Sequence, residues 1–74
     1  MKLTAKDIKT IRSVYRLTAE EMALILGISR PYVHLMESEK KRITEQVISK
    51  YKREFDLTPE KLEKIEAVYR EYSI

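Results

Sequence analysis

Cysteine and tryptophan are absent from this sequence, and glycine and histidine occur only once each. Without cysteine the chain forms no disulfide bond and no thiolate metal site, which fits a reducing cytoplasm. The single histidine, His34, has no second imidazole with which to share a metal ion. No apolar run approaches the roughly 20 residues that a membrane-spanning helix needs, and no signal peptide is visible. We therefore expect a cytoplasmic protein with no metal, no cofactor and no membrane partner.

A catalytic constellation is also missing from the sequence. The carboxylates are scattered over the predicted helix faces, and Glu63 and Glu66 are expected to face solvent. The glycine content excludes a glycine-rich loop that would cradle a phosphate. A lone histidine on an exposed helix face is more typical of polar surface than of acid–base chemistry. We therefore do not expect an enzyme.

The scarcity of glycine and proline favours helices, because these residues are the usual helix breakers. The chain is 43% apolar and 74 residues long, enough for one small domain. One helix start signal recurs: an apolar residue, then threonine or serine, then an apolar residue four positions beyond that cap. The caps are Thr4, Thr18, Ser29, Thr44 and Thr58. The sequence therefore predicts an all-α fold, a compact five-helix bundle that forms a single domain over residues 1–74.

Residues 18–37 have the pattern of two short helices joined by a tight turn. Glu21 follows Thr18 at capping-box spacing, and Gly27 is placed to end the first helix in the left-handed conformation. Ser29 then caps the second helix, whose first turn tolerates Pro31 because its missing amide costs little there. Met22, Ala23, Leu26, Val33 and Met36 are predicted to face the core. The opposite face of the second helix is left for an external partner, and it carries Pro31, His34, Leu35 and Ser38.

The charge is distributed unevenly along the chain. Residues 1–53 hold 12 lysines and arginines against six acidic residues, whereas residues 54–74 hold three against six. The two-helix unit therefore lies in the part with a net charge of +6, and the last segment carries −3. A polyanionic partner fits this distribution, and a solvated mixed-charge surface is the alternative.

These residues resemble the lambda-repressor-like, Cro/cI-type helix-turn-helix family over roughly residues 4–57. The spacing that carries the resemblance is Met22-Ala23, Leu26-Gly27-Ile28-Ser29-Arg30, Val33 and Met36-Glu37. It implies a helix-turn-helix at residues 18–37 and a recognition helix, residues 30–37, in a DNA major groove. The implied function is sequence-specific binding of double-stranded DNA by a transcriptional regulator or repressor of a phage or bacterium. In relatives the glutamate pairs with an arginine of the first helix, which implies an ion pair between Arg12 and Glu37.

The exposed face of the second helix holds the predicted base contacts. Arg30 is the strongest candidate, because its guanidinium fork matches guanine O6 and N7, although a phosphate contact is the alternative. Leu35 either meets a thymine methyl group or belongs to an apolar patch that binds a protein. Pro31 and His34 lie beside them as further base contacts.

The predicted phosphate contacts centre on three consecutive cations, Lys40, Lys41 and Arg42, just before a helix N-terminus. Thr44 and the free amides behind it would add donors. A solvated connector is the alternative for this loop. Thr18 and Tyr32 complete the set, and packing along the helix edge is the alternative for Tyr32.

The last predicted helix, residues 59–72, has two open uses. Its apolar stripe, Leu62, Ile65, Tyr69 and Tyr72, either closes the core or pairs with a second copy. Val68, Tyr69 and Tyr72 are the predicted dimer interface, because tyrosines combine apolar area with a polar tip. A homodimer is expected because one short helix rarely gives enough affinity for DNA.

The sequence departs from the family pattern at positions where partners are selected. Ala19 stands where glutamine is frequent, and Glu39 stands where glycine is usual. Leu24, Ile25 and Leu35 replace residues that are commonly polar. The alternative function is therefore a protein-binding modulator of another regulator, with little DNA binding of its own, acting through Leu24, Ile25 and Leu35. Arg30 and the basic loop favour DNA.

Overall fold

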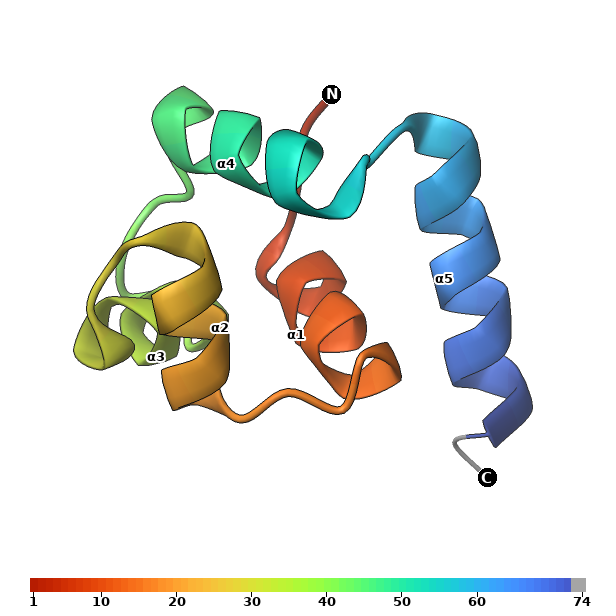
Figure 1. The fold of residues 1–74 in the computed structure, drawn as a ribbon, viewed down its shortest axis with the longest axis horizontal. Helices are drawn as coiled ribbons and strands as arrows, with labels where there is room; N and C mark the ends of the chain where they lie inside the picture. Colours follow the sequence, from red (N-terminus) through yellow and green to blue (C-terminus); the bar gives the residue numbers. More distant parts are fainter. Residues whose placement is uncertain (73–74) are drawn as a thin grey trace.

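The computed structural model describes residues 1–72 and confirms the predicted all-α fold (Figure 1). No residue of that range lies in a β-strand. The five helices are α1 (Ala5–Val14), α2 (Ala19–Leu26), α3 (Arg30–Glu37), α4 (Glu45–Phe55) and α5 (Pro59–Tyr72).

Each helix begins directly after the hydroxyl residue that its local sequence predicts as its cap. Thr4 and Thr18 form complete capping boxes, in which the side chain three residues later also accepts from the backbone amide of the cap. Ser29 and Thr44 accept from the amides of Tyr32 and Val47, and the Thr58 hydroxyl accepts from the Lys61 amide at 3.1 Å. Because these caps are local, the helix starts follow from the sequence.

The core lies where α1 meets the other helices. Figure 1 shows α1 in the middle of the molecule, with α2 and α3 on one side and α5 on the other. α1 packs against α3 and α5, and α2 packs against α3 and α4. The largest fully buried side chains are Tyr51, Ile8, Ile11, Met22, Leu26, Met36 and Val33. In this arrangement α2 and α3 pack on the rest of the domain through their inner faces, and their outer faces are left exposed.

The predicted stripe on α5 does not close the core along its whole length. Ile65 is buried and Leu62 packs partly against the core. Further along, Tyr69 is 37% exposed and Tyr72 is 81% exposed, so these rings lie at the surface. The reason is geometric, because α5 runs along α1, which has only ten residues. Within residues 1–72 nothing covers the outer face of α5.

None of the helices within residues 1–72 has both the length and the apolar character needed to cross a membrane.

Candidate functional site

The turn between α2 and α3 sets how α3 is presented. Gly27 ends α2 with φ +68°, in the left-handed region that favours glycine. A Cβ at this position would meet nothing within 4 Å, so the backbone angle alone calls for glycine. The Ile28 amide then donates to the Ala23 carbonyl at 3.0 Å and closes the helix end. The chain is thereby turned sharply into the Ser29 cap.

The inner face of α3 is committed to the core, and its outer face is open. Val33 and Met36 are fully buried. Arg30, Pro31 and His34 are exposed, and Leu35 is half-buried. An open groove runs over this outer face, and it is lined by Arg30, Pro31, His34, Leu35, Ser38 and Lys40. The structure therefore brings the four predicted base-contact residues together, and none of the residues lining their groove is acidic.

The loop after α3 is folded back onto the end of that helix. The Leu35 carbonyl accepts from the backbone amides of Lys40, at 2.8 Å, and Lys41, at 3.1 Å. The Ser38 hydroxyl donates to the same carbonyl at 3.2 Å. Glu39 makes the reversal possible by adopting φ +63°. These bonds place Lys40 at the edge of the α3 groove.

The remaining loop cations extend the positive surface toward the start of α1. Lys40, Lys41 and Arg42 line a second open groove, together with Thr4 and Ala5. Glu39 also lines this groove, so one carboxylate lies among the cations. The predicted phosphate-contact loop is therefore continuous with the α3 groove through Lys40, which lines both.

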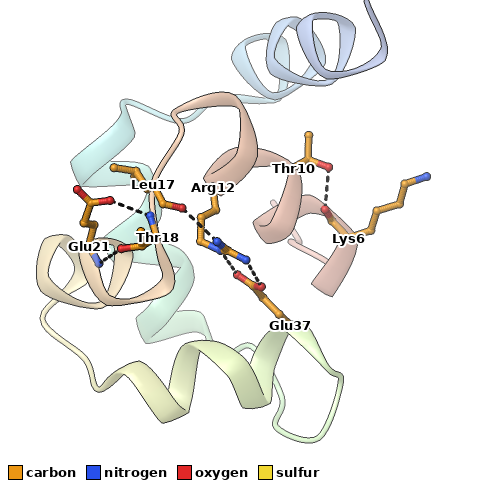
Figure 2. A network of polar contacts seen from close by, with 7 residues as sticks. All are labelled: Lys6, Thr10, Arg12, Leu17, Thr18, Glu21 and Glu37. Carbon is orange, nitrogen blue, oxygen red and sulfur yellow. Dashed lines mark hydrogen bonds and ion pairs between the residues drawn. The ribbon is translucent and has the colours of Figure 1, made fainter. Parts of the chain in front are cut away.

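An ion pair ties α3 to α1 behind the groove (Figure 2). Arg12 Nε donates to Glu37 Oε2 at 2.8 Å and Arg12 Nη2 donates to Glu37 Oε1 at 2.9 Å. Arg12 Nη1 also donates to the Leu17 carbonyl at 3.1 Å. The hydrogen bonds to Glu37 raise the pKa of Arg12 above its usual value, against the opposing effect of burial. Glu37 is 7% exposed, so the pair fixes the end of α3 from inside the domain.

The other predicted phosphate contacts are already engaged in local structure. The Thr18 hydroxyl accepts from the Glu21 amide, and the Thr18 amide donates to the Glu21 carboxylate at 2.8 Å (Figure 2). A phosphate at Thr18 would have to compete with that carboxylate. The Thr44 hydroxyl accepts from the Val47 amide. Tyr32 is half-buried and packs partly against the core.

Two buried polar groups lie near this site, and the predicted site residues include neither of them. Thr10 is 4% exposed, and its hydroxyl donates to the Lys6 carbonyl at 2.8 Å (Figure 2). Tyr51 is fully buried, and its hydroxyl makes no hydrogen bond among residues 1–72. Burial raises the pKa of Tyr51, and the charge of Glu37 adds to the shift. Helical periodicity places Tyr51 in the apolar stripe of α4 but does not show what its hydroxyl touches, and it gives no such signal for Thr10.

Two further surfaces carry exposed apolar side chains. A groove beside α5 is lined by Ser13, Val14, Arg16, Val68, Tyr69 and Tyr72, so it unites the predicted dimer residues with the end of α1. On α2, Leu24 is 77% exposed and Ile25 is 38% exposed. Leu35, the third residue of the predicted protein-binding patch, lines the α3 groove instead.

Comparisons with protein-family models, with curated proteins and with solved structures found no match to this chain.

Proposed function

We propose that this protein binds double-stranded DNA in a sequence-specific manner and acts as a transcriptional regulator of Cro/repressor type. In this proposal α2 and α3 form a helix-turn-helix, and α3 is the recognition helix in the major groove. The observation that carries the proposal is the outer face of α3. Its groove holds two cations, an imidazole and two apolar side chains, it has no acidic residue, and it continues into a basic loop.

The contacts divide into those that read bases and those that hold the backbone. Arg30 stands in the first turn of α3, where its guanidinium fork suits guanine O6 and N7. Lys40, Lys41 and Arg42 would neutralise phosphates beside the groove and so fix the register of α3. Because the amides of Lys40 and Lys41 donate to the Leu35 carbonyl, their loop is held at the end of α3, and Lys40 lines the base-reading groove.

The packing beneath α2 and α3 supports the helix-turn-helix assignment. The left-handed Gly27, the small buried Ala23 and the Arg12–Glu37 pair occupy the positions at which the sequence resembles the Cro/cI-type family. Gly27 and Ala23 allow α2 and α3 to cross closely, and the ion pair fixes α3 to α1. These features support the proposal that α2 and α3 form a helix-turn-helix.

We further propose that the protein acts as a homodimer through the groove beside α5. Val68, Tyr69 and Tyr72 line this groove and are exposed in a single chain. Pairing two copies would present two recognition helices to two half-sites, which multiplies a weak single contact.

A protein-binding modulator is the second candidate function, and the exposure of Leu24 favours it. A leucine that is 77% exposed on α2, beside the exposed Ile25, suits an apolar contact with another protein. This second function gives no role to the cations around α3. The two functions separate because Leu24→Asp would remove the protein contact and leave duplex binding intact.

Duplex affinity of charge variants tests the DNA-binding proposal. Arg30→Ala should lose about tenfold or more in affinity for the preferred duplex, because a bidentate arginine–guanine contact contributes about 1–3 kcal/mol. Replacing Lys40, Lys41 and Arg42 by glutamine should lower affinity for every duplex. It should also reduce the slope of log affinity against log salt by about three units per bound protomer.

The matched control removes the same charge elsewhere. Lys9, Lys64 and Arg70 are exposed and none of them lines the α3 groove. Replacing these three by glutamine should leave most of the affinity and the slope in place. Equal losses in the two triple variants would mean that the protein attracts DNA only through its net charge, and the proposed site would be wrong.

A further inference from the structure

Two apolar side chains stand on the DNA-facing side that the proposed function assigns to α3. Pro31 and Leu35 are four residues apart, which places them one helical turn apart on the same face. Pro31 is exposed and Leu35 is half-buried, and both line the groove that also holds Arg30 and His34. Neither side chain can donate or accept a hydrogen bond. A partner in this groove must therefore offer apolar groups between its polar ones.

We infer that Pro31 and Leu35 read the 5-methyl groups of thymine, so that thymines face these two residues in the preferred duplex. The inference rests on the proposed function and specifies what its recognition helix selects. Thymine carries the one apolar substituent on the major-groove edges of the four bases. Apart from ring C–H groups such as the C5–H of cytosine, which project no methyl, the other edge groups there are hydrogen-bond donors or acceptors, which an aliphatic side chain would leave unpaired.

The backbone that carries the two side chains is fixed before any partner arrives. The pyrrolidine ring of Pro31 fixes its own φ within the first turn of α3. The Leu35 carbonyl accepts from Lys40, Lys41 and the Ser38 hydroxyl, so the backbone at Leu35 is anchored to the loop. A preorganised apolar pair loses little conformational entropy on contact, which favours discrimination of a group as small as a methyl.

The surrounding charges favour a polyanion over an apolar protein as the occupant of this groove. Arg30, the first residue of α3, and Lys40, which follows the end of α3, line the same groove, and no lining residue is acidic. An aliphatic strip between cations matches base edges that lie between phosphate strands. An apolar protein partner would leave both cations desolvated without a counter-charge.

The test replaces thymine by deoxyuridine, one position at a time, in the preferred duplex. Deoxyuridine keeps every hydrogen-bonding group of thymine and removes only the methyl. The wild-type protein should lose about fourfold in affinity for each methyl that Pro31 or Leu35 contacts, from the transfer free energy of one buried carbon. Replacement outside the contacted positions should have no effect.

Variants of the protein assign each methyl to its residue. With Leu35→Ala, thymine and deoxyuridine should bind equally at the position facing residue 35 and still differ at the position facing Pro31. Pro31→Ala should give the reverse pattern. Leu35→Met keeps an apolar side chain and should retain the discrimination, which controls for damage to the fold, as does the helical circular dichroism of each variant.

The outcomes separate this inference from the function on which it rests. If the wild-type protein binds a preferred duplex tightly but tolerates deoxyuridine at every position, methyl reading is overturned and DNA binding stands. If both alanine variants keep the full discrimination, other residues read the methyl and the assignment is overturned. If the wild-type protein prefers no duplex at all, the proposed function fails and the inference fails with it.

Discussion

Glu37 connects two helices through a single carboxylate. Both of its oxygens accept from Arg12, and its side chain is 7% exposed. We predict that Glu37→Ala lowers the free energy of unfolding by about 3 kcal/mol, because Arg12 is left partly buried without its partner. Chemical denaturation followed by circular dichroism measures the change. A loss within about 0.5 kcal/mol would mark Glu37 as ordinary surface.

The matched control lies in the same core. Tyr51→Phe removes a buried hydroxyl that makes no hydrogen bond in residues 1–72. Because no partner is lost, its unfolding free energy should stay within about 0.5 kcal/mol of the wild type or rise. A large loss in both variants would show that this region tolerates no change, and the Glu37 result would then not measure the ion pair.

Residue roles were predictable from the sequence to different degrees. The Arg12–Glu37 contact followed from the resemblance of Glu37 to a family position, whereas periodicity alone would have left Arg12 among the surface charges. The unpaired hydroxyl of Tyr51 could not be predicted, because the groups near it include Arg12 and Glu37 of other helices. The Thr10 hydroxyl bonds within its own helix, to the Lys6 carbonyl. Thr18 was predicted correctly as a cap, and that role competes with the phosphate contact also expected of it.

At the scale of elements, the loop after α3 depends on one unfavourable backbone angle. Glu39 adopts φ +63°, where a residue with a Cβ is strained and glycine is not. We predict that Glu39→Gly raises the free energy of unfolding by about 0.5–1 kcal/mol, net of the added freedom of the unfolded chain. It should also raise duplex affinity, because it removes a carboxylate from the groove lined by Lys40, Lys41 and Arg42.

Asp56 provides a matched control for Glu39. It ends α4 with φ +49° and is also acidic, but it stands at the turn before α5 and not beside α3. Asp56→Gly should therefore give a similar gain in stability with little change in duplex affinity. If both variants raise affinity equally, net charge accounts for the effect and the position of Glu39 does not.

The elements were predictable where their signals are local. Each cap residue and the turn glycine act within a few residues of themselves, so the helix starts and the break at Gly27 could be predicted from the sequence. The fold of the Lys40–Arg42 loop could not, because it depends on the Leu35 carbonyl accepting from two amides of that loop. The outward position of Tyr69 and Tyr72 depends on how α5 lies against α1.

At the scale of the whole molecule, the groove beside α5 is where we place the second copy. We predict that a Tyr69→Asp, Tyr72→Asp double variant sediments as a monomer under conditions in which the wild type sediments as a dimer. Two buried carboxylates facing their symmetry mates would repel one another and would be poorly solvated. Analytical ultracentrifugation measures the mass.

Leu24→Asp is the control for that experiment. Leu24 is more than three-quarters exposed and lies on α2, away from the groove beside α5. Its substitution should leave the wild-type mass unchanged. A dimer that survives in the double tyrosine variant would rule out α5 as the interface, and a dimer lost only in Leu24→Asp would place the interface on α2.

The overall architecture was predictable as a class, and its surfaces were predictable only in part. An all-α domain with a basic first segment and an acidic last segment follows directly from the sequence. The structure adds that α3 and α5 lie on opposite sides of α1 (Figure 1). The α3 groove is lined by residues close in sequence, so the helical pattern indicates its face. The groove beside α5 is formed by residues distant in sequence, such as Arg16 and Tyr72, so no local pattern indicates it.

Selection from a random duplex pool, followed by a salt titration, tests most directly the claim that α3 and its basic loop bind a preferred DNA duplex. We predict enrichment of a two-fold motif with half-sites about one helical turn apart. Affinity for the enriched duplex should fall steeply with salt, as expected when several phosphates are neutralised. No enrichment at low salt would contradict the claim and would favour a protein partner that covers Leu24.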